Sequence, residues 1–163
     1  MSRRVVLVVE DGSEYRDAFR RLAPEGEQVE WLHAPDARTA RELLSSRPVD
    51  AVFIDLVFDR TPVEALAGDR SRPLEHRVRN QGFYVLDAVA PAIPAASPVL
   101  IAYDFASQPA RLEALRRVCP RLEGVPESSG AAAILARLLA RAEGLSPAAG
   151  PRAGSASDSG SDR

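Results

Sequence analysis

The chain alternates between short, nearly continuous apolar runs and segments whose apolar residues recur every three or four positions. Runs of the first kind are typical of strands that are buried on both faces of a parallel sheet. They are RVVLVV (4–9), QVEWLH (28–33), VDAVFIDLVF (49–58), PVLIAY (98–103) and RLEGVP (121–126). The pattern therefore predicts five strands, and the third is the most apolar of them.

The segments between these strands have the period of helices. In the first segment, Tyr15, Phe19 and Leu22 are spaced i, i+4, i+7 and form one apolar face. The second helix is expected to begin after Asp36, because aspartate caps helix N-termini well. Three further helices are expected at 82–90, 111–118 and 131–142. Strands that alternate with helices predict an α/β fold, in which helices cover both faces of a parallel sheet.

Two segments fall outside this alternation. Residues 59–81 form an insertion after the third strand that contains five arginines and few apolar residues. Within it, TPVE (61–64) has the capping-box pattern, which predicts a short helical turn. Residues 144–163 have too little apolar content to fold, so we expect a disordered tail. The rest, residues 1–143, is expected to form one domain.

Composition and charge narrow the class of protein. The chain is 45% apolar and 27% charged with a net charge of −2, so nothing drives it electrostatically toward nucleic acid or an anionic membrane. No apolar run reaches the roughly 18 residues that span a bilayer, and the first run is too short for a signal peptide. Cys119 is the sole cysteine, which excludes a disulfide framework. We therefore expect a cytoplasmic protein that binds neither nucleic acid nor membrane.

Three carboxylates are expected at one edge of the sheet. Glu10 and Asp11 follow the first strand, and Asp55 lies toward the end of the third. Ligands of such sheets bind at the carboxyl ends of the strands, near the switch in strand order. Converging carboxylates repel each other unless a cation lies among them, and oxygen ligands suit Mg²⁺. With a metal in place, Asp55 would be a nucleophile toward a phosphoryl group.

The sequence resembles the receiver domains of bacterial two-component response regulators. The residues that carry the resemblance are VVLVVEDGSEYRDAFRRL (5–22), AVFIDLVF (51–58) and GFYVLDAVA (82–90), while PVLIAYD (98–104) matches more loosely. The resemblance spans most of residues 4–142. It implies a flavodoxin-like sheet with the strand order 2-1-3-4-5.

The resemblance also implies a site and a partner. An acidic pair after the first strand of receivers binds Mg²⁺, and an aspartate that ends the third strand accepts phosphate from a histidine kinase. Carried over to this chain, the metal ligands are Glu10, Asp11, Asp55 and the backbone carbonyl of Val57. Asp55 is then the phosphoacceptor, and the output passes through contacts with a sensor histidine kinase or another signalling protein.

Two positions depart from the family pattern. Receivers carry Ser or Thr at the end of the fourth strand, where this chain has Ala102 and Tyr103. They also carry a lysine after the fifth strand, where this chain has Pro126 and Glu127. All 21 Lys-or-Arg residues are arginine, so no lysine elsewhere can substitute. Tyr103 is open to two interpretations, a packing residue or a residue whose rotation is coupled to a bound partner.

The insertion allows two hypotheses as well. One of its arginines (Arg70, Arg72, Arg77 or Arg79) folds over Asp55 and replaces the missing lysine, since Arg grips phosphate in bidentate fashion. Alternatively, these arginines dock a partner, which is the interpretation we favour because an insertion this long is usually functional if it is ordered.

Two functions therefore remain open. The first is a receiver-like protein of a phosphorelay, with Asp55 as its phosphoacceptor. The second is a pseudo-receiver, an interaction module that works without phosphorylation. An enzyme is disfavoured, because DLV (55–57) lacks the second aspartate of a dehalogenase-like phosphatase and no strand is followed by a Gly-rich phosphate loop.

Overall fold

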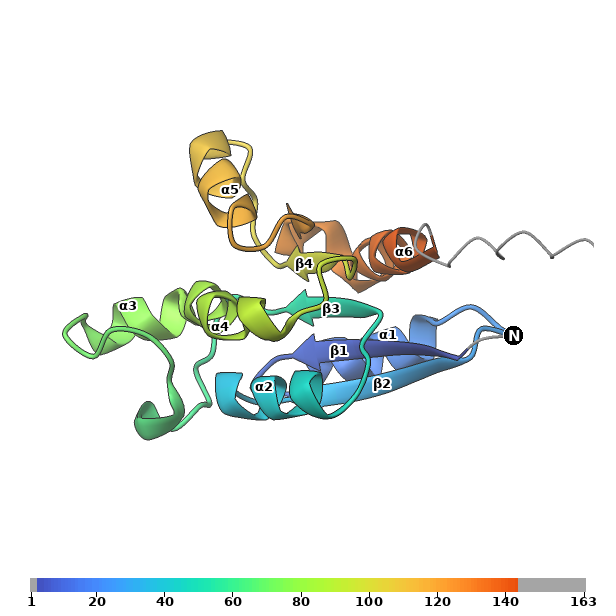
Figure 1. Ribbon diagram of the computed structural model, residues 1–163, viewed down its shortest axis with the longest axis horizontal. Helices are drawn as coiled ribbons and strands as arrows, with labels where there is room; N and C mark the ends of the chain where they lie inside the picture. Colours follow the sequence, from blue (N-terminus) through green and yellow to red (C-terminus); the bar gives the residue numbers. More distant parts are fainter. Residues whose placement is uncertain (1–2, 144–163) are drawn as a thin grey trace, which may run out of the picture.

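Five parallel strands form a sheet with helices on both faces in the computed structural model, which describes residues 3–143 (Figure 1). The strands are β1 (Arg4–Val9), β2 (Val29–Ala34), β3 (Ala51–Ile54), β4 (Val99–Ile101) and β5 (Leu122–Gly124). They are arranged in the order β2-β1-β3-β4-β5, and every neighbouring pair is parallel. The predicted fold class and strand order are confirmed. The expected tail, residues 144–163, lies outside the described residues.

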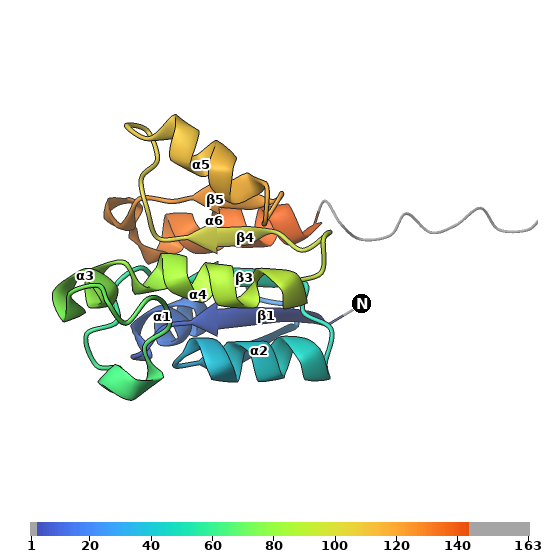
Figure 2. The same cartoon turned by 60° about the vertical axis from the view of Figure 1, so that its left-hand side comes forward.

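The helices divide into two layers, because alternate residues of each strand point to opposite faces. Leu7 and Val9 of β1 contribute to one core together with apolar residues of α2 and α4, while Val6 and Val8 contribute to the other with α1 and α6. Figure 2 shows α2 and α4 side by side on the first face. The main helices are α1 (Glu14–Leu22), α2 (Ala37–Ser46), α4 (Gln81–Val89), α5 (Pro109–Arg116) and α6 (Gly130–Glu143). None of the described helices is long and apolar enough to cross a bilayer.

The third strand is shorter than its apolar run. β3 ends at Ile54, whereas the sequence pattern extends to Phe58. Beyond Asp55 the chain leaves the sheet, and the backbone N–H of Phe58 donates to the carbonyl of Val78 in the insertion (3.1 Å). Phe58 is fully buried. The last apolar residues of the run therefore pack against the insertion rather than extend the strand.

The insertion, residues 59–81, is ordered and carries two helical segments. These are a 3₁₀ turn, η1 (Val63–Ala65), and a short α-helix, α3 (Leu74–Arg79), which the sequence did not predict. Arg77 is buried at 4% exposure, and its guanidinium donates to the carbonyl of Leu66 (2.9 Å). Gln81 is also buried, and its amide donates to the carbonyl of Ala67 (3.4 Å). Side chains from the end of the insertion thus hold its middle in place.

The predicted capping box at 61–64 is wrong in its contacts. The hydroxyl of Thr61 does not cap the following turn; it lies 3.4 Å from Oδ2 of Asp11. The residue preceding the turn is Pro62, which makes no side-chain cap. A turn does form here, as expected, but Thr61 takes part in a contact between distant segments.

Tyr84 of α4 fixes the insertion at a further point. Gly68 has a φ of +95°, which an L side chain rarely adopts, and its Cα faces the Tyr84 ring. A Cβ added at Gly68 would lie 2.5 Å from Cγ of Tyr84 and 2.8 Å from Cε1, well inside van der Waals contact. Glycine is thus required at this position for two reasons, its backbone conformation and the ring above it.

We predict that Gly68→Ala destabilises the protein more than Gly26→Ala. Gly26 has a similar φ of +88° but nothing within 4 Å of an added Cβ, so its substitution measures the backbone cost alone. The clash with Tyr84 should lower the free energy of unfolding by about 1–3 kcal/mol beyond that of Gly26→Ala. Urea denaturation of both variants measures the difference. Equal losses would show that Tyr84 does not pack on Gly68.

Candidate functional site

Three carboxylates lie at the carboxyl edge of the sheet because β1 and β3 are neighbours. Val9 and Ile54, the last residues of these strands, are paired in register. The backbone N–H of Asp55 donates to the carbonyl of Val9 (2.9 Å), which continues the pairing by one residue. Glu10, Asp11 and Asp55, which we call the acidic edge, therefore leave the sheet at the same place, as predicted from the sequence.

Glu10 caps helix α1. Its carboxylate accepts hydrogen bonds from the backbone N–H groups of Tyr15 (3.0 Å) and Arg16 (2.8 Å) in the first turn. The hydroxyl of Ser13, which precedes the helix, is instead directed to Asp17 (2.8 Å). Glu10 is 1% exposed, so these two amides provide the partners that a buried carboxylate requires.

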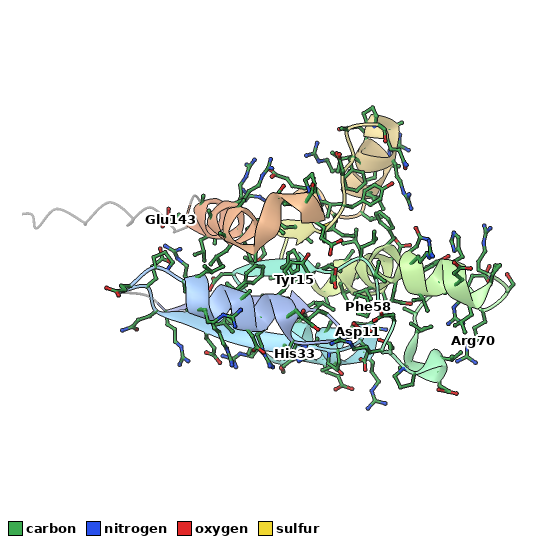
Figure 3. All side chains as sticks on the ribbon, turned by 180° about the vertical axis from the view of Figure 1, so that it is seen from behind. Asp11, Tyr15, His33, Phe58, Arg70 and Glu143 are labelled. Carbon is green, nitrogen blue, oxygen red and sulfur yellow. The ribbon has the colours of Figure 1, made fainter. Side chains whose placement is uncertain are left out.

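His33 holds the backbone of Glu10 in place. Its Nε2 lies 3.0 Å from the Glu10 carbonyl, which can only accept, so this ring nitrogen is the donor. Figure 3 shows His33 close to Asp11 at the end of the sheet. This contact is consistent with a structural role for His33.

Asp11 faces the insertion rather than the other carboxylates. Its Oδ2 accepts hydrogen bonds from the backbone N–H groups of Arg60 (2.6 Å) and Thr61 (3.1 Å). Two consecutive amides thus converge on one carboxylate oxygen. This contact joins the end of β1 to the start of the insertion, and the sequence analysis did not foresee it.

Asp55 lies among carboxylates in a partly buried position. Its Oδ1 accepts one hydrogen bond, from the backbone N–H of Leu56 (2.7 Å). Burial raises the pKa of Asp55 to about 7, against the lowering effect of the Leu56 hydrogen bond, and the charges of Glu10, Glu127 and Asp11 raise it further.

Gly82 allows helix α4 to approach the backbone of Asp55. The N–H of Gly82 donates to the carbonyl of Leu56 (2.9 Å). A Cβ at this position would overlap the carbonyl oxygen of Asp55 and lie 2.9 Å from Cα of Leu56. The first turn of α4 therefore packs directly against the residues that follow β3.

The arrangement does not fit the predicted Mg²⁺ site. Within residues 3–143, no group of three or more His, Cys, Asp or Glu side chains is placed to hold a metal ion. The physical reason is that Glu10 is directed to helix α1 and Asp11 to the insertion. The predicted set of Glu10, Asp11, Asp55 and the Val57 carbonyl is adjacent in the fold but is not arranged as a ligand set.

The two residues after β4 belong to the core. Ala102 is buried, and its N–H donates to the carbonyl of Ile54 (3.0 Å). The ring of Tyr103 packs against Phe83 and Phe105, with ring centroids 5.0 and 4.8 Å away. Tyr103 therefore has the surroundings of a packing residue.

An arginine completes this aromatic cluster. The guanidinium carbon of Arg111 in α5 lies 3.9 Å from the ring centroid of Phe83 and 5.6 Å from that of Tyr103. Such cation–π contacts contribute roughly 0.5–2 kcal/mol each, depending on exposure. Helix α5 is thereby tied to α4 and to Tyr103, which follows β4.

The segment after β5 brings an acid toward Asp55. Pro126 precedes a 3₁₀ turn, η3 (Glu127–Ser129), and Glu127 is exposed. Its carboxylate is close enough to raise the pKa of Asp55. The segment after β5 therefore adds a negative charge near Asp55.

The insertion arginines have different surroundings, and none of them is paired with Asp55 in the structure. Arg77 is buried inside the insertion, as described above, so it is not on a surface that a partner can reach. Arg79 is exposed and pairs with Glu75 (3.0 Å) one turn earlier in α3. Arg70 and Arg72 are exposed, and Figure 3 shows Arg70 at the far end of the insertion from Asp11. The structure therefore gives no support to the hypothesis that an arginine of the insertion folds over Asp55 in place of the receiver lysine.

Sequence reasoning missed the residues that contact Asp11. Arg60 and Thr61 follow Asp55 by a few residues, and their backbone amides reach Asp11 because β1 and β3 end side by side. The Arg60 side chain also forms an ion pair with Glu14 at the start of α1. The contact could have been anticipated from the topology: Asp11 follows β1, residues 60 and 61 follow β3, and these two strands are neighbours.

Comparison with solved structures identifies the fold. The signal receiver domain of a LuxO repressor protein from Vibrio parahaemolyticus superposes with a TM-score of 0.56 at 16% identity, covering 87% of this chain and 92% of that one. The NtrX receiver domain from Brucella abortus gives 0.53 at 22% identity (86% and 99% covered). The receiver domain of Francisella response regulator 1452 gives 0.54 at 15% identity (86% and 97% covered).

These comparisons establish the receiver-domain fold. The coverage is close to complete on both sides, so the likeness concerns the whole domain rather than one βα unit. No protein-family model matches the sequence, and a search of curated proteins finds no match. At these identities the likeness is one of fold, and activity must be argued from the site itself.

We predict that Asp55→Asn changes how stability depends on pH. The pKa of Asp55 is raised from 3.8 to about 7 in the folded protein. The free energy of unfolding that protonated Asp55 contributes is therefore fully present below pH 3.8 and is lost as the pH rises through 7. The asparagine variant avoids this loss. Its free energy of unfolding relative to wild type should therefore increase between pH 4 and pH 8, by a few kcal/mol at about 1.4 kcal/mol per pKa unit.

Metal-free urea denaturation at a series of pH values tests this prediction. Asp59→Asn is the matched control, because it removes an exposed carboxylate from the same stretch of chain. If the difference in free energy of unfolding between Asp55→Asn and wild type stays constant with pH, Asp55 does not titrate with a raised pKa in the folded protein.

Proposed function

We propose that this chain is a receiver-like signal-transduction protein that acts in the bacterial cytoplasm through protein contacts, without a phosphorylation cycle on Asp55. The observation that carries the proposal is the charge around Asp55. Its neighbours Glu10, Asp11 and Glu127 are all acidic, and each of these charges raises the pKa of Asp55.

Electrostatics argues against a phosphoryl group at this place. Phosphorylation adds about 1.5–2 negative charges at neutral pH. Two unit charges about 5 Å apart repel by about 3 kcal/mol at an effective dielectric constant of 20. Phosphoryl transfer normally depends on cations and hydrogen-bond donors placed around the developing charge. Here the segment that the resemblance matches to the receiver lysine contains Pro126 and Glu127 and no basic residue, and Glu10 and Asp11 already accept hydrogen bonds from backbone amides.

The route by which a phosphoryl group would alter the surface is also blocked. Ala102 has no hydroxyl, and Tyr103 packs between two aromatic rings. Moving Tyr103 toward Asp55 would break contacts with Phe83 and Phe105 and disturb the Arg111 contact with this cluster. This packing favours a single conformation of the surface near Tyr103 over a switch between two conformations.

The surface we propose for partner binding is the outer side of the insertion together with Val57. Val57, Val63 and Leu74 are large apolar residues with 40%, 48% and 48% exposure. Arg70, Arg72 and Arg79 lie on the same segment and are exposed. Exposed apolar residues ringed by charge are common at protein interfaces. The proposed partner is a signalling protein, such as a sensor histidine kinase.

One observation favours the alternative, a phosphorelay receiver. Asp55 has the place of a phosphoacceptor, at the end of β3 on the edge where ligands of such folds bind, and its side chain has a single hydrogen bond in the described structure. If Mg²⁺ rearranged Glu10 and Asp11, Asp55 could still react. Labelling with a small phosphodonor separates the two functions.

We predict that acetyl phosphate and Mg²⁺ do not phosphorylate the protein. Intact mass spectrometry should find the same mass for wild type and Asp55→Asn after incubation, because repulsion from the surrounding acids disfavours the phosphorylated state. An ordinary response-regulator receiver under identical conditions is the positive control. A gain of one phosphoryl group in wild type that is absent from Asp55→Asn would overturn the proposal and support the phosphorelay function.

A further inference from the structure

The Asp11 carboxylate is the contact between the acidic edge and the insertion. It accepts hydrogen bonds from the N–H groups of Arg60 and Thr61 at 2.6 and 3.1 Å, and the Thr61 hydroxyl lies 3.4 Å away. We propose that Asp11 is a positioning residue that holds the start of the insertion against the strand ends. In this chain its role is to orient the segment that follows Asp55, in place of binding a cation.

The chain around residue 60 depends on Asp11 for its hydrogen bonds. In the described structure, neither the Arg60 nor the Thr61 amide donates to a backbone carbonyl, and Pro62 has no N–H to donate. The Thr61 contact is partly buried, so its loss would leave a backbone donor with limited access to water, which costs free energy. Hydrogen bonds to a carboxylate are also stronger than those to a neutral acceptor. Asp11 therefore provides the main local reason for the path of the chain here.

A second contact directs the Arg60 side chain to the same place. Its guanidinium pairs with Glu14, whose carboxylate also accepts from the N–H of Ser13 (2.9 Å). The pair crosses over Gly12, where an added Cβ would meet both side chains. Both partners are exposed, so this ion pair adds little stability by itself. Its effect is to fix the direction of Arg60 once Asp11 holds the backbone.

The other fixed points of the insertion lie further along the chain. The N–H of Phe58 donates to the carbonyl of Val78, and the guanidinium of Arg77 donates to the carbonyl of Leu66. Gly68 packs against the Tyr84 ring. These contacts secure the middle and the end of the segment. The stretch between Phe58 and Val63 has Asp11 as its tertiary acceptor, so the position of exposed Val63 follows from this one carboxylate.

This inference deepens the proposed function, because it makes Asp11 responsible for the geometry of the proposed partner-binding surface. It rests on the proposed function in one respect, that Asp11 is not used for a metal ion. The two can fail separately, since the position of the insertion is measured without metal or phosphodonor.

The test is hydrogen–deuterium exchange of the full chain in EDTA, followed by mass spectrometry of peptides covering residues 57–66. We expect Asp11→Ala to speed exchange there by about 10- to 100-fold, which corresponds to losing a hydrogen bond to a charged group. Asp11→Asn should lie between Ala and wild type, because its amide oxygen still accepts. Asp55→Asn is the matched control: it removes the neighbouring carboxylate and should not exchange faster than wild type at residues 57–66.

Peptides from β1 and β3 report whether each variant is folded. If Asp11→Ala does not fold, Asp11→Asn carries the test, since it retains the shape and one acceptor. Exchange at residues 57–66 that is unchanged in a folded Asp11 variant would overturn the proposal. So would equal acceleration in Asp55→Asn, because it would show that the charge of the acidic edge, rather than the Asp11 hydrogen bonds, orders the insertion.

Discussion

The rest of the site depends on how three neighbouring carboxylates find hydrogen-bond partners. Adjacent parallel strands β1 and β3 bring Glu10, Asp11 and Asp55 to one edge of the sheet. Each carboxylate is met by backbone amides: Glu10 by the first turn of α1, Asp11 by residues 60 and 61, and Asp55 by Leu56. Asp55 lies in a setting that raises its pKa to about 7.

The hydrogen bonds between the carboxylates and backbone amides also explain the path of the chain after β3. Because Asp11 is directed to the insertion, the segment after Asp55 turns back over the strand ends instead of leaving the surface free. Gly82 then lets α4 pack on the backbone of Asp55, and Tyr103 occupies the neighbouring core with its aromatic partners. The fold is that of a receiver domain, and at the carboxyl edge of its sheet Tyr103 packs against aromatic rings while Glu127 lies near Asp55.

Features that depend on local sequence patterns were predicted, whereas contacts between residues far apart in the sequence were not. The strands, the sheet order and the Asp36 cap, whose side chain accepts from the N–H of Thr39 (2.7 Å), rest on local patterns or on the resemblance. The convergence of the acids follows from parallel topology. The partner of Asp11 lies 49 residues away and is determined by the adjacency of β1 and β3 rather than by a local pattern. Helix α3 was missed because its sequence, LEHRVR, is largely polar and it is anchored by buried Arg77 rather than by an apolar stripe.

A magnesium titration followed by ¹H–¹⁵N NMR tests the central claim most directly. The amides that donate to the acidic edge, those of Tyr15, Arg16, Leu56, Arg60 and Thr61, report on each carboxylate in turn. If backbone amides satisfy these acids in place of a cation, the five resonances keep their positions at millimolar Mg²⁺. Saturable shifts of the Arg60 and Thr61 amides in wild type that disappear in Asp11→Asn would contradict the account, because they would show that a cation takes Asp11 from the insertion.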